Sequence, residues 1–178
     1  MNRRTETTEK SRSTQQALID RKIVKALENA GVNFYASVPC GLLDGILKII
    51  NHEKSVTHVP VTREEEGVGI CAGAYLGGVT PALLMQNSGL GNSVNALLSL
   101  TGLYHIGLLL VIGYRGRRGE EQIEAQIPMG TATTKLLDIV QARYMIIDQE
   151  RGVETITSFA KQTRDEIRAV LLSPKVWK

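Results

Sequence analysis

The segment from Thr57 to Gly102 constrains the fold more than any other part of the chain. It contains two short apolar runs, THVPVT and TPALLMQ, and each run is followed by a turn and by a helix-like stretch of small residues. Strands and helices that alternate in this order are typical of a parallel sheet in which helices make the crossovers. The segment therefore predicts two consecutive strand–helix units.

Strand-like and helix-like runs also alternate along the rest of the chain. The apolar run IGLLLVIGY is the best candidate for the sheet centre, and the last ten residues, AVLLSPKVWK, are expected to add an edge strand. We predict an α/β fold with a single doubly wound, mainly parallel sheet and helices on both faces. Strands are expected at 32–39, 55–62, 80–86, 106–114 and 143–148, and helices at 15–31, 41–53, 63–78, 92–104, 134–141 and 153–167.

In such a sheet, ligands bind outside the carboxyl ends of the strands. Three turns that should lie at those ends carry unusual side chains, and their sequences are TREEEG, QNSGLG and YRGRRGEEQ. We therefore expect these three turns to lie along one edge of the domain.

The composition is that of an ordinary soluble globular protein, with 43% hydrophobic and 22% charged residues among 178. The net charge of +3 is too small to indicate nucleic-acid binding, and no apolar run approaches the length of a membrane span. We expect a disordered polar tail over residues 1–13 and one domain over residues 14–178. Cys40 and Cys71 lack metal or redox spacing, so we expect buried thiols in a cytoplasmic protein, with no metal site.

Three consecutive glutamates, Glu64, Glu65 and Glu66, begin the helix after the second strand. Thr62 is a candidate N-cap with Glu65 at position N3, so the acids could serve only to stabilise the start of the helix. The helix that follows, GVGICAGAYLGG, is rich in glycine, which costs about 1 kcal/mol per helical position relative to alanine. Such a helix needs close packing. Close packing would exclude water from a neighbouring carboxyl, and this desolvation would raise the carboxyl pKa into the range of a proton donor.

The turn after the third strand contains a dense cluster of uncharged polar side chains. A glycine-containing turn between a strand and a helix can present backbone N–H groups to an anion, although no P-loop or dinucleotide motif is present. The alternative is that these side chains only cap the helix and satisfy the turn. The cluster consists of Gln86, Asn87, Ser88, Asn92 and Asn95.

A charged loop after the fourth strand offers a second possible anion site. Its guanidinium groups, on Arg115, Arg117 and Arg118, could donate paired hydrogen bonds to sulfonate, phosphonate or carboxylate oxygens. They could equally form local ion pairs with Glu120 and Glu121. The three histidines are far apart in sequence, and we expect them to be structural or surface residues.

REEEGVGICAGAYLGG followed by MQNSGLGNSVNALLSL resembles the pyrimidine-binding domain of thiamine diphosphate enzymes. Together with SVPCGLL and AQIPMG, these motifs are most similar to the alpha subunits of sulfopyruvate decarboxylases, and phosphonopyruvate decarboxylases are close relatives. In that superfamily the catalytic glutamate lies ten positions before a tyrosine. Counting back from Tyr75 selects Glu65.

The resemblance implies roles for several side chains. The carboxyl of Glu65 would bond N1′ of the cofactor's aminopyrimidine and favour the imino tautomer that removes the C2 proton. It further implies cofactor contacts from Asn87, Ser88 and Gly89. Substrate contacts are expected from Asn87 and Gln126, and hypothetically from Arg115, Arg117 or Arg118.

One departure from the superfamily bears on the partners of this chain. The Gly-Asp-Gly motif that holds the diphosphate and Mg²⁺ is absent, and only Asp44 is followed by glycine. The resemblance therefore implies a hetero-oligomer, in which this chain binds the pyrimidine end of thiamine diphosphate. A separate beta subunit would carry the domain that binds the diphosphate and Mg²⁺.

The expected activity is that of a carbon–carbon lyase, a decarboxylase that converts 3-sulfopyruvate to sulfoacetaldehyde and CO₂ in coenzyme M biosynthesis. One alternative is a split decarboxylase for phosphonopyruvate or another small anionic 2-oxo acid. An alternative of a different class is a non-catalytic partner subunit in which Glu65 is only a helix cap.

Overall fold

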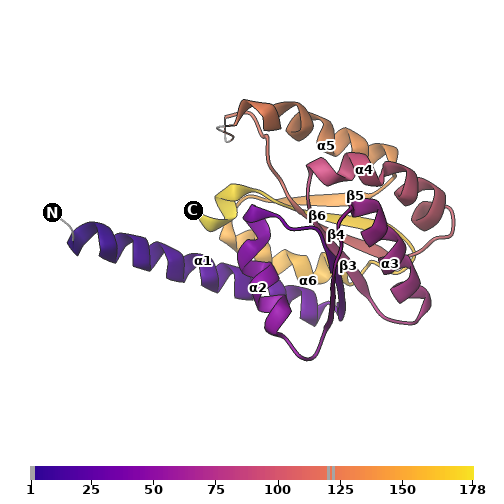
Figure 1. Cartoon of the computed structure of the whole chain (residues 1–178), viewed down its shortest axis with the longest axis horizontal. Coiled ribbons are helices and arrows are strands. Elements are labelled where there is room, and N and C mark those ends of the chain that lie inside the picture. Colours follow the sequence, from indigo (N-terminus) through magenta and orange to yellow (C-terminus); the bar gives the residue numbers. More distant parts are fainter. Residues whose placement is uncertain (1–2, 120, 122) are drawn as a thin grey trace.

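The computed structural model describes residues 3–119, 121 and 123–178, with side chains described from Thr14 onward. Within this part, six strands form one sheet in the order β2-β1-β3-β4-β6-β5, and all neighbouring strands run parallel (Figure 1). The strands are β1 (Phe34–Ser37), β2 (Thr57–Pro60), β3 (Pro81–Gln86), β4 (Leu108–Gly113), β5 (Arg143–Ile147) and β6 (Ile167–Leu172). The predicted parallel sheet is confirmed, and β4 is one of its two central strands.

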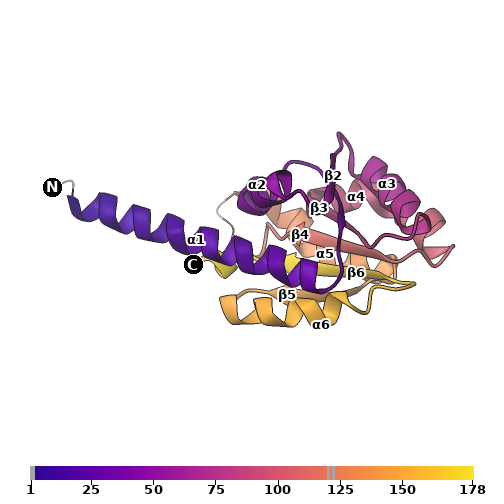
Figure 2. The ribbon, with the colours of Figure 1, turned by 90° about the horizontal axis from the view of Figure 1, so that it is seen from below.

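Helices cover both faces of the sheet, as predicted. The α-helices are α1 (Arg3–Asn29), α2 (Asp44–His52), α3 (Glu64–Leu76), α4 (Ser88–Ala96), α5 (Ile127–Ile139) and α6 (Ile156–Ala160). A π-helical stretch (Leu97–Gly102) continues α4, and 3₁₀ turns lie at Gly41–Leu43, Glu124–Gln126, Glu150–Thr155 and Pro174–Trp177. Helices α1, α2 and α6 pack on one face and α3, α4 and α5 on the other (Figures 1 and 2).

Alternating side chains of the central strands separate the two layers of the core. Leu84 of β3 and Val111 of β4 pack toward α1 and α2, whereas their neighbours Leu83 and Leu110 pack toward α3 and α4. All four side chains are fully buried. Because both faces are covered, the strands are continuous apolar runs rather than alternating ones. None of the helices described is long and apolar enough to cross a membrane.

The structure corrects three predictions, namely the place of one strand in the sheet and the starts of two helices. The C-terminal run forms β6, which pairs with both β4 and β5 and is therefore an interior strand rather than an edge strand. Helix α4 begins at Ser88, immediately after β3, and α5 begins at Ile127, seven residues before the predicted start. Both helices begin early because polar turn residues and a proline are well tolerated in a first helical turn.

The N-terminal segment includes residues 1–13, for which the sequence predicts a disordered tail. Helix α1 begins at Arg3, and its first half projects away from the domain (Figures 1 and 2), while residues 1–2 lie outside the described part. Packing against the sheet begins near Ile19, which is buried, and continues through Ile23 and Leu27. The extent of order in the segment before residue 14 stays a prediction.

A buried carboxylate joins three elements on the α1 face. Asp20 of α1 accepts a hydrogen bond of 2.8 Å from Trp177 Nε1, and a Cβ atom on Gly45 of α2 would lie 1.9 Å from Asp20 Oδ2. Burial raises the pKa of the Asp20 carboxyl, the Trp177 hydrogen bond opposes that shift, and the nearby charge of Asp44 adds to it.

We expect Asp20→Asn to become progressively more stable, relative to wild type, as the pH rises from about 4 to about 7. An acid whose pKa is raised by folding binds its proton more tightly in the native state, so its ionisation lowers the free energy of unfolding as the pH rises. Asparagine keeps an acceptor for Trp177 without a charge. Chemical denaturation at both pH values measures the difference, and a constant difference would contradict the assignment.

Candidate active site

The carboxyl ends of the parallel strands meet at one edge, and the three unusual turns leave from that edge. Strand β2 leads through Val61 into α3, β3 ends at Gln86 just before α4, and β4 ends at Gly113 before the arginine segment, which we define as residues 114–119. The chain reverses its direction along the sheet between β1 and β3, which is where doubly wound folds bind ligands. The predicted convergence of the three turns is confirmed.

Glu66 stabilises the start of α3. One oxygen of its carboxylate, Oε2, accepts hydrogen bonds from Thr62 Oγ1 at 2.9 Å, from Thr62 N at 3.3 Å and from Arg63 N at 3.3 Å. The hydrogen bond from the Thr62 hydroxyl is the largest cause of a lowered Glu66 pKa. The prediction that Thr62 is the N-cap and Glu65 the N3 residue was wrong by one position, because Arg63 is the N-cap and Glu66 lies at N3.

Glu64 holds α3 against the start of α4. Its Oε2 atom accepts a hydrogen bond of 3.0 Å from Asn92 Nδ2. A Cβ atom on Gly89 would lie 2.3 Å from the Glu64 carboxyl carbon. Glycine at this position therefore allows the two helices to approach closely, and the predicted cofactor contact of Gly89 stays a prediction.

Glu65 is the acid of the three that serves neither purpose. Its Oε1 atom lies 2.7 Å from Arg63 Nε, whereas Oε2 is buried and has no hydrogen-bond partner in the described structure. The side chain as a whole keeps 32% of its surface exposed, so one oxygen faces inward while the group remains reachable. A buried acceptor without a partner is costly and indicates a missing donor. A protonated ring nitrogen of an aminopyrimidine would fit this oxygen.

Polar side chains from two turns meet beside the end of β3. Gln86 Nε2 donates to Ser88 Oγ at 3.0 Å and to Gln126 Oε1 at 3.2 Å. The structure therefore brings together the predicted site residues Ser88 and Gln126, which are 38 positions apart in the sequence. Gln86, which joins them, was part of the polar cluster but received no site role from the sequence.

Asn87 has a structural environment that the sequence did not predict. Its side chain is fully buried, and it donates to the Arg115 carbonyl at 2.9 Å and to Thr133 Oγ1 at 2.8 Å. Its Oδ1 atom accepts a hydrogen bond of 3.1 Å from Arg115 N. The predicted direct contacts of Asn87 with cofactor and substrate stay untested, and the hydrogen bonds observed here are made within the protein.

The three arginines of the charged loop have different environments. Arg115 forms a bidentate ion pair with Glu121, at 2.7 and 2.9 Å, which confirms one of the predicted local pairs; Glu120 lies outside the described residues. Arg117 stacks on the ring of Tyr114, with 5.7 Å between its guanidinium carbon and the ring centroid. Arg118 is exposed, and no ion pair joins it to another side chain in the described part of the chain.

The remaining candidate groups are structural. His58 is hydrogen-bonded to Ser37 Oγ at 2.8 Å and to Asn51 Oδ1 at 2.6 Å, and burial lowers its pKa, so the ring stays neutral near pH 7. Cys40 and Cys71 are buried free thiols, as predicted. Burial raises the pKa of both thiols, that of Cys71 to about 12, so neither is a ready thiolate.

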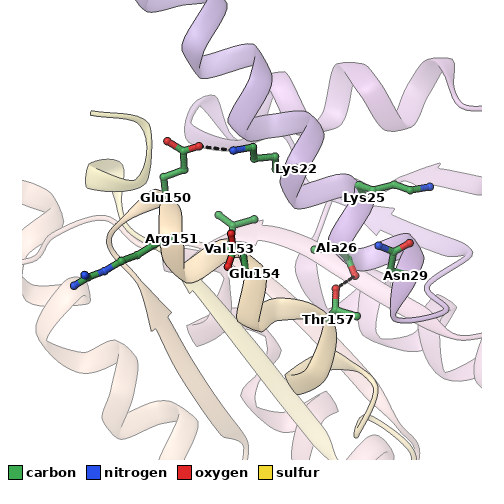
Figure 3. Close-up of a pocket in the computed structure, with 9 residues that line it drawn as sticks. All are labelled: Lys22, Lys25, Ala26, Asn29, Glu150, Arg151, Val153, Glu154 and Thr157. Atoms are coloured by element: carbon green, nitrogen blue, oxygen red, sulfur yellow. Dashed lines mark hydrogen bonds and ion pairs between the residues drawn. The ribbon is translucent and has the colours of Figure 1, made fainter.

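A pocket of about 630 Å³ lies between α1 and the 3₁₀ turn Glu150–Thr155 that leads into α6, on the face of the sheet opposite to α3 (Figure 3). The ion pair between Lys22 and Glu150 spans it at 2.6 Å, and Thr157 donates to the Ala26 carbonyl at 3.0 Å. None of the predicted site residues lines this pocket. The candidate site is therefore the edge at Glu65 rather than this pocket.

No protein-family model matches the chain. The chain is 42% identical over 159 residues to sulfopyruvate decarboxylase subunit alpha of Methanothermobacter thermautotrophicus, covering 87% of this chain and 95% of the relative. It is 54% identical over 122 residues to the subunit of the same name from Methanococcus maripaludis, covering 68% of this chain and 72% of the relative. A sulfopyruvate decarboxylase of Methanosarcina acetivorans is 34% identical, and the match covers 89% of this chain and 41% of that protein.

The fold is similar to that of a benzoylformate decarboxylase from Polynucleobacter necessarius. The TM-score is 0.66 at 17% sequence identity, and the match covers 90% of this chain and 30% of that one. At this identity the likeness concerns the fold alone.

Alanine substitutions at the neighbouring glutamates test which acid caps α3. We expect Glu66→Ala to lower the melting temperature by a few degrees, because Thr62 and Arg63 lose their acceptor, and Glu65→Ala to leave it nearly unchanged. Since hydrogen bonding lowers the Glu66 pKa, its contribution to stability is present above the unfolded value of about 4.3 and is lost as the pH falls below it. Thermal melts of both variants at about pH 7 and pH 3 provide the measurement. Equal destabilisation by the two substitutions at neutral pH would contradict the assignment.

Proposed function

Because the chain belongs to the family of sulfopyruvate decarboxylase alpha subunits, we propose that it is the pyrimidine-binding half of a thiamine diphosphate-dependent decarboxylase. The proposed reaction converts 3-sulfopyruvate to sulfoacetaldehyde and CO₂, and its proposed place is coenzyme M biosynthesis in the cytoplasm. When bound, thiamine diphosphate supplies the nucleophilic carbon that adds to the 2-oxo group and accepts the electron pair left by CO₂.

The observation that carries this proposal is the buried Oε2 atom of Glu65, which has no hydrogen-bond partner among the residues that the structure describes. In the proposed complex this oxygen holds the proton shared with N1′ of the aminopyrimidine. The other oxygen is already fixed by Arg63 at 2.7 Å, so the carboxyl plane is oriented before the cofactor arrives. Glu64 and Glu66 cannot take this role without giving up the contacts that hold α3 in place.

The proposed substrate region is the polar edge beside Glu65. Gln86, Ser88 and Gln126 already form a connected cluster, and uncharged donors of this kind suit the keto and carboxylate oxygens of a 2-oxo acid. Among the three arginines, we assign Arg118 to the sulfonate, because Arg115 pairs with Glu121 and Arg117 lies over the ring of Tyr114. Phosphonopyruvate, which carries one more negative charge, remains the alternative substrate.

The uncharged face of α3 and α4 supports the proposal of a partner subunit. No residue between Glu66 and His105 carries a formal charge, although this segment forms two helices that lie partly on the surface. Several large apolar side chains are exposed there, namely Ile70, Leu76, Leu98, Leu103 and Tyr104. A Cβ atom on Gly69 or Gly73 would meet nothing within 4 Å, so these glycines leave room for close approach by another surface. Exposed apolar patches of this kind mark protein interfaces.

We assign this uncharged face to the beta subunit, which would bring the diphosphate and Mg²⁺ site that this chain lacks. The subunit alpha names of the relatives support a partner. The longer Methanosarcina relative supports it too, since this chain accounts for only 41% of that protein. In this arrangement the two subunits close around Glu65 and exclude water from it.

Glu65→Gln tests the catalytic assignment. We expect CO₂ release from 3-sulfopyruvate to fall by about a hundredfold or more, because glutamine keeps a hydrogen-bonding side chain but cannot exchange the proton. The measurement uses this chain mixed with its candidate beta subunit, thiamine diphosphate and Mg²⁺. Glu64→Gln is the matched control, and it should retain activity within a few-fold.

Retention of activity by Glu65→Gln within a few-fold would favour the non-catalytic reading of the subunit. The wild-type chain without its partner should release no CO₂. Parallel assays with phosphonopyruvate decide between the two substrates.

Leu76→Ser tests the interface. Leu76 is 75% exposed on the uncharged face, so we expect the substitution to leave the isolated chain folded and to weaken its association with the beta subunit by tenfold or more, which is about 1.4 kcal/mol. The control is Leu18→Ser, at an exposed leucine of α1 on the opposite face of the sheet. Analytical ultracentrifugation or calorimetric titration gives the affinities, and equal effects of the two substitutions would exclude this face.

A further inference from the structure

We propose that Glu121 and Asn87 are positioning residues, which hold the arginine segment in the shape that leaves Arg118 available to the sulfonate of the substrate. This inference rests on the proposed function for the identity of the anion. Glu121 was not a predicted site residue, and Asn87 was predicted to touch the ligand directly.

Asn87 fixes the backbone at the start of the arginine segment. Its side-chain amide donates to the carbonyl of Arg115 and accepts from the N–H of the same residue. One planar group therefore binds both backbone polar groups of Arg115. The second N–H of the amide donates to Thr133 Oγ1, on α5. Because the Asn87 side chain is fully buried, this single residue ties the end of β3 to the end of β4 and to α5.

Glu121, which follows the arginine segment in the sequence, also fixes its backbone. Its carboxylate accepts two hydrogen bonds from the Arg115 guanidinium, one from Gly116 N at 3.1 Å and one from Ile123 N at 3.0 Å. Only 5% of the side-chain surface is exposed. The hydrogen bond from Arg115 is the largest cause of a Glu121 pKa lowered to about 2. The carboxylate therefore remains ionised, and both ends of the loop stay bound to it, throughout the neutral range.

Close packing against α5 then determines where the next two arginines lie. Gly116 has a φ of +83°, and a Cβ atom there would lie 1.9 Å from the Gln126 carbonyl oxygen. Only glycine allows the segment to pass so close to the residue before α5. Arg117 and Arg118 follow directly and line a pocket of about 260 Å³ with Thr131 of α5.

The environments of the three arginines identify the one that remains for a ligand. Glu121 accepts hydrogen bonds from Nε and Nη2 of Arg115, and Arg117 lies over Tyr114 and 4.0 Å from Asp148. Arg118 is exposed at the pocket and forms no ion pair with another described side chain. A guanidinium group at a small pocket suits a compact anion such as a sulfonate. Glu121 would act on the substrate only through this arrangement.

The first experiment compares Glu121→Gln with Glu124→Gln in the assembled enzyme. Glu124 is an exposed acid three positions away, so it matches the loss of one negative charge without touching Arg115. For Glu121→Gln we expect the KM for 3-sulfopyruvate to rise about tenfold, with kcat and the KM for thiamine diphosphate changed by less than about twofold. Glu124→Gln should change none of these constants. Equal constants for the two variants, with an active wild type, would overturn the inference.

The second experiment measures the loop directly in the full chain without its partner. Hydrogen exchange of peptides that contain the Gly116 and Ile123 amides should be faster in Glu121→Gln than in wild type or Glu124→Gln, because both N–H groups lose a charged acceptor. Arg115→Lys should give a smaller effect in the same direction, since lysine keeps the charge but cannot donate two parallel hydrogen bonds. Unchanged exchange would overturn the structural part of the inference whatever the enzyme assay shows.

The two experiments separate this inference from the proposed function. Absence of sulfopyruvate turnover by the wild-type assembly would refute the proposed function and, with it, the sulfonate role of Arg118. Normal turnover together with faster exchange and an unchanged KM would show that Glu121 shapes the loop without positioning anything for the substrate. Only faster exchange combined with a raised KM supports the inference.

Discussion

Parallel pairing of β1 with both β2 and β3 is the constraint on which the rest of the structure depends. It places the ends of these strands at one edge, so that α3 and α4 start side by side. Glu64 and Gly89 can then meet, and the helices approach as closely as a glycine permits. This contact and the Glu66 cap fix the first turn of α3 on both sides of Glu65.

The helical period gives the three consecutive glutamates at the start of α3 three different environments. Successive residues of an α-helix point about 100° apart, so Glu64, Glu65 and Glu66 cannot share one environment. Glu64 faces α4, Glu66 turns back to the start of its own helix, and Glu65 keeps a buried oxygen with no partner among the described residues. The proposed chemistry therefore depends on Glu64 and Glu66 being fixed by protein contacts, while Glu65 keeps an acceptor with no partner among the described residues.

A similar division applies to the arginine segment. Ordering a charged side chain at a site costs conformational entropy and desolvation unless the surrounding structure fixes its position. Asn87 and Glu121 fix the backbone of the segment, and the side chain of Arg118 stays exposed. The uncharged surface of α3 and α4 has the opposite character, with several large apolar side chains exposed. An edge with one polar and one apolar flank suits a site that two subunits complete.

The sequence alone determined the alternation of strands and helices, the two-layered core and the position of β4, because these follow from local hydrophobic periodicity. The resemblance to thiamine diphosphate enzymes singled out Glu65, ten positions before Tyr75. Only the tertiary structure decided that Glu66 is the cap, that Asn87 and Glu121 serve the arginine segment, and that β6 is interior. The physical reason is that each of these outcomes depends on a contact between partners, and local sequence patterns do not encode which residues meet in space. Asn87 meets Thr133 across 46 positions, and β6 pairs with β4 across about 60.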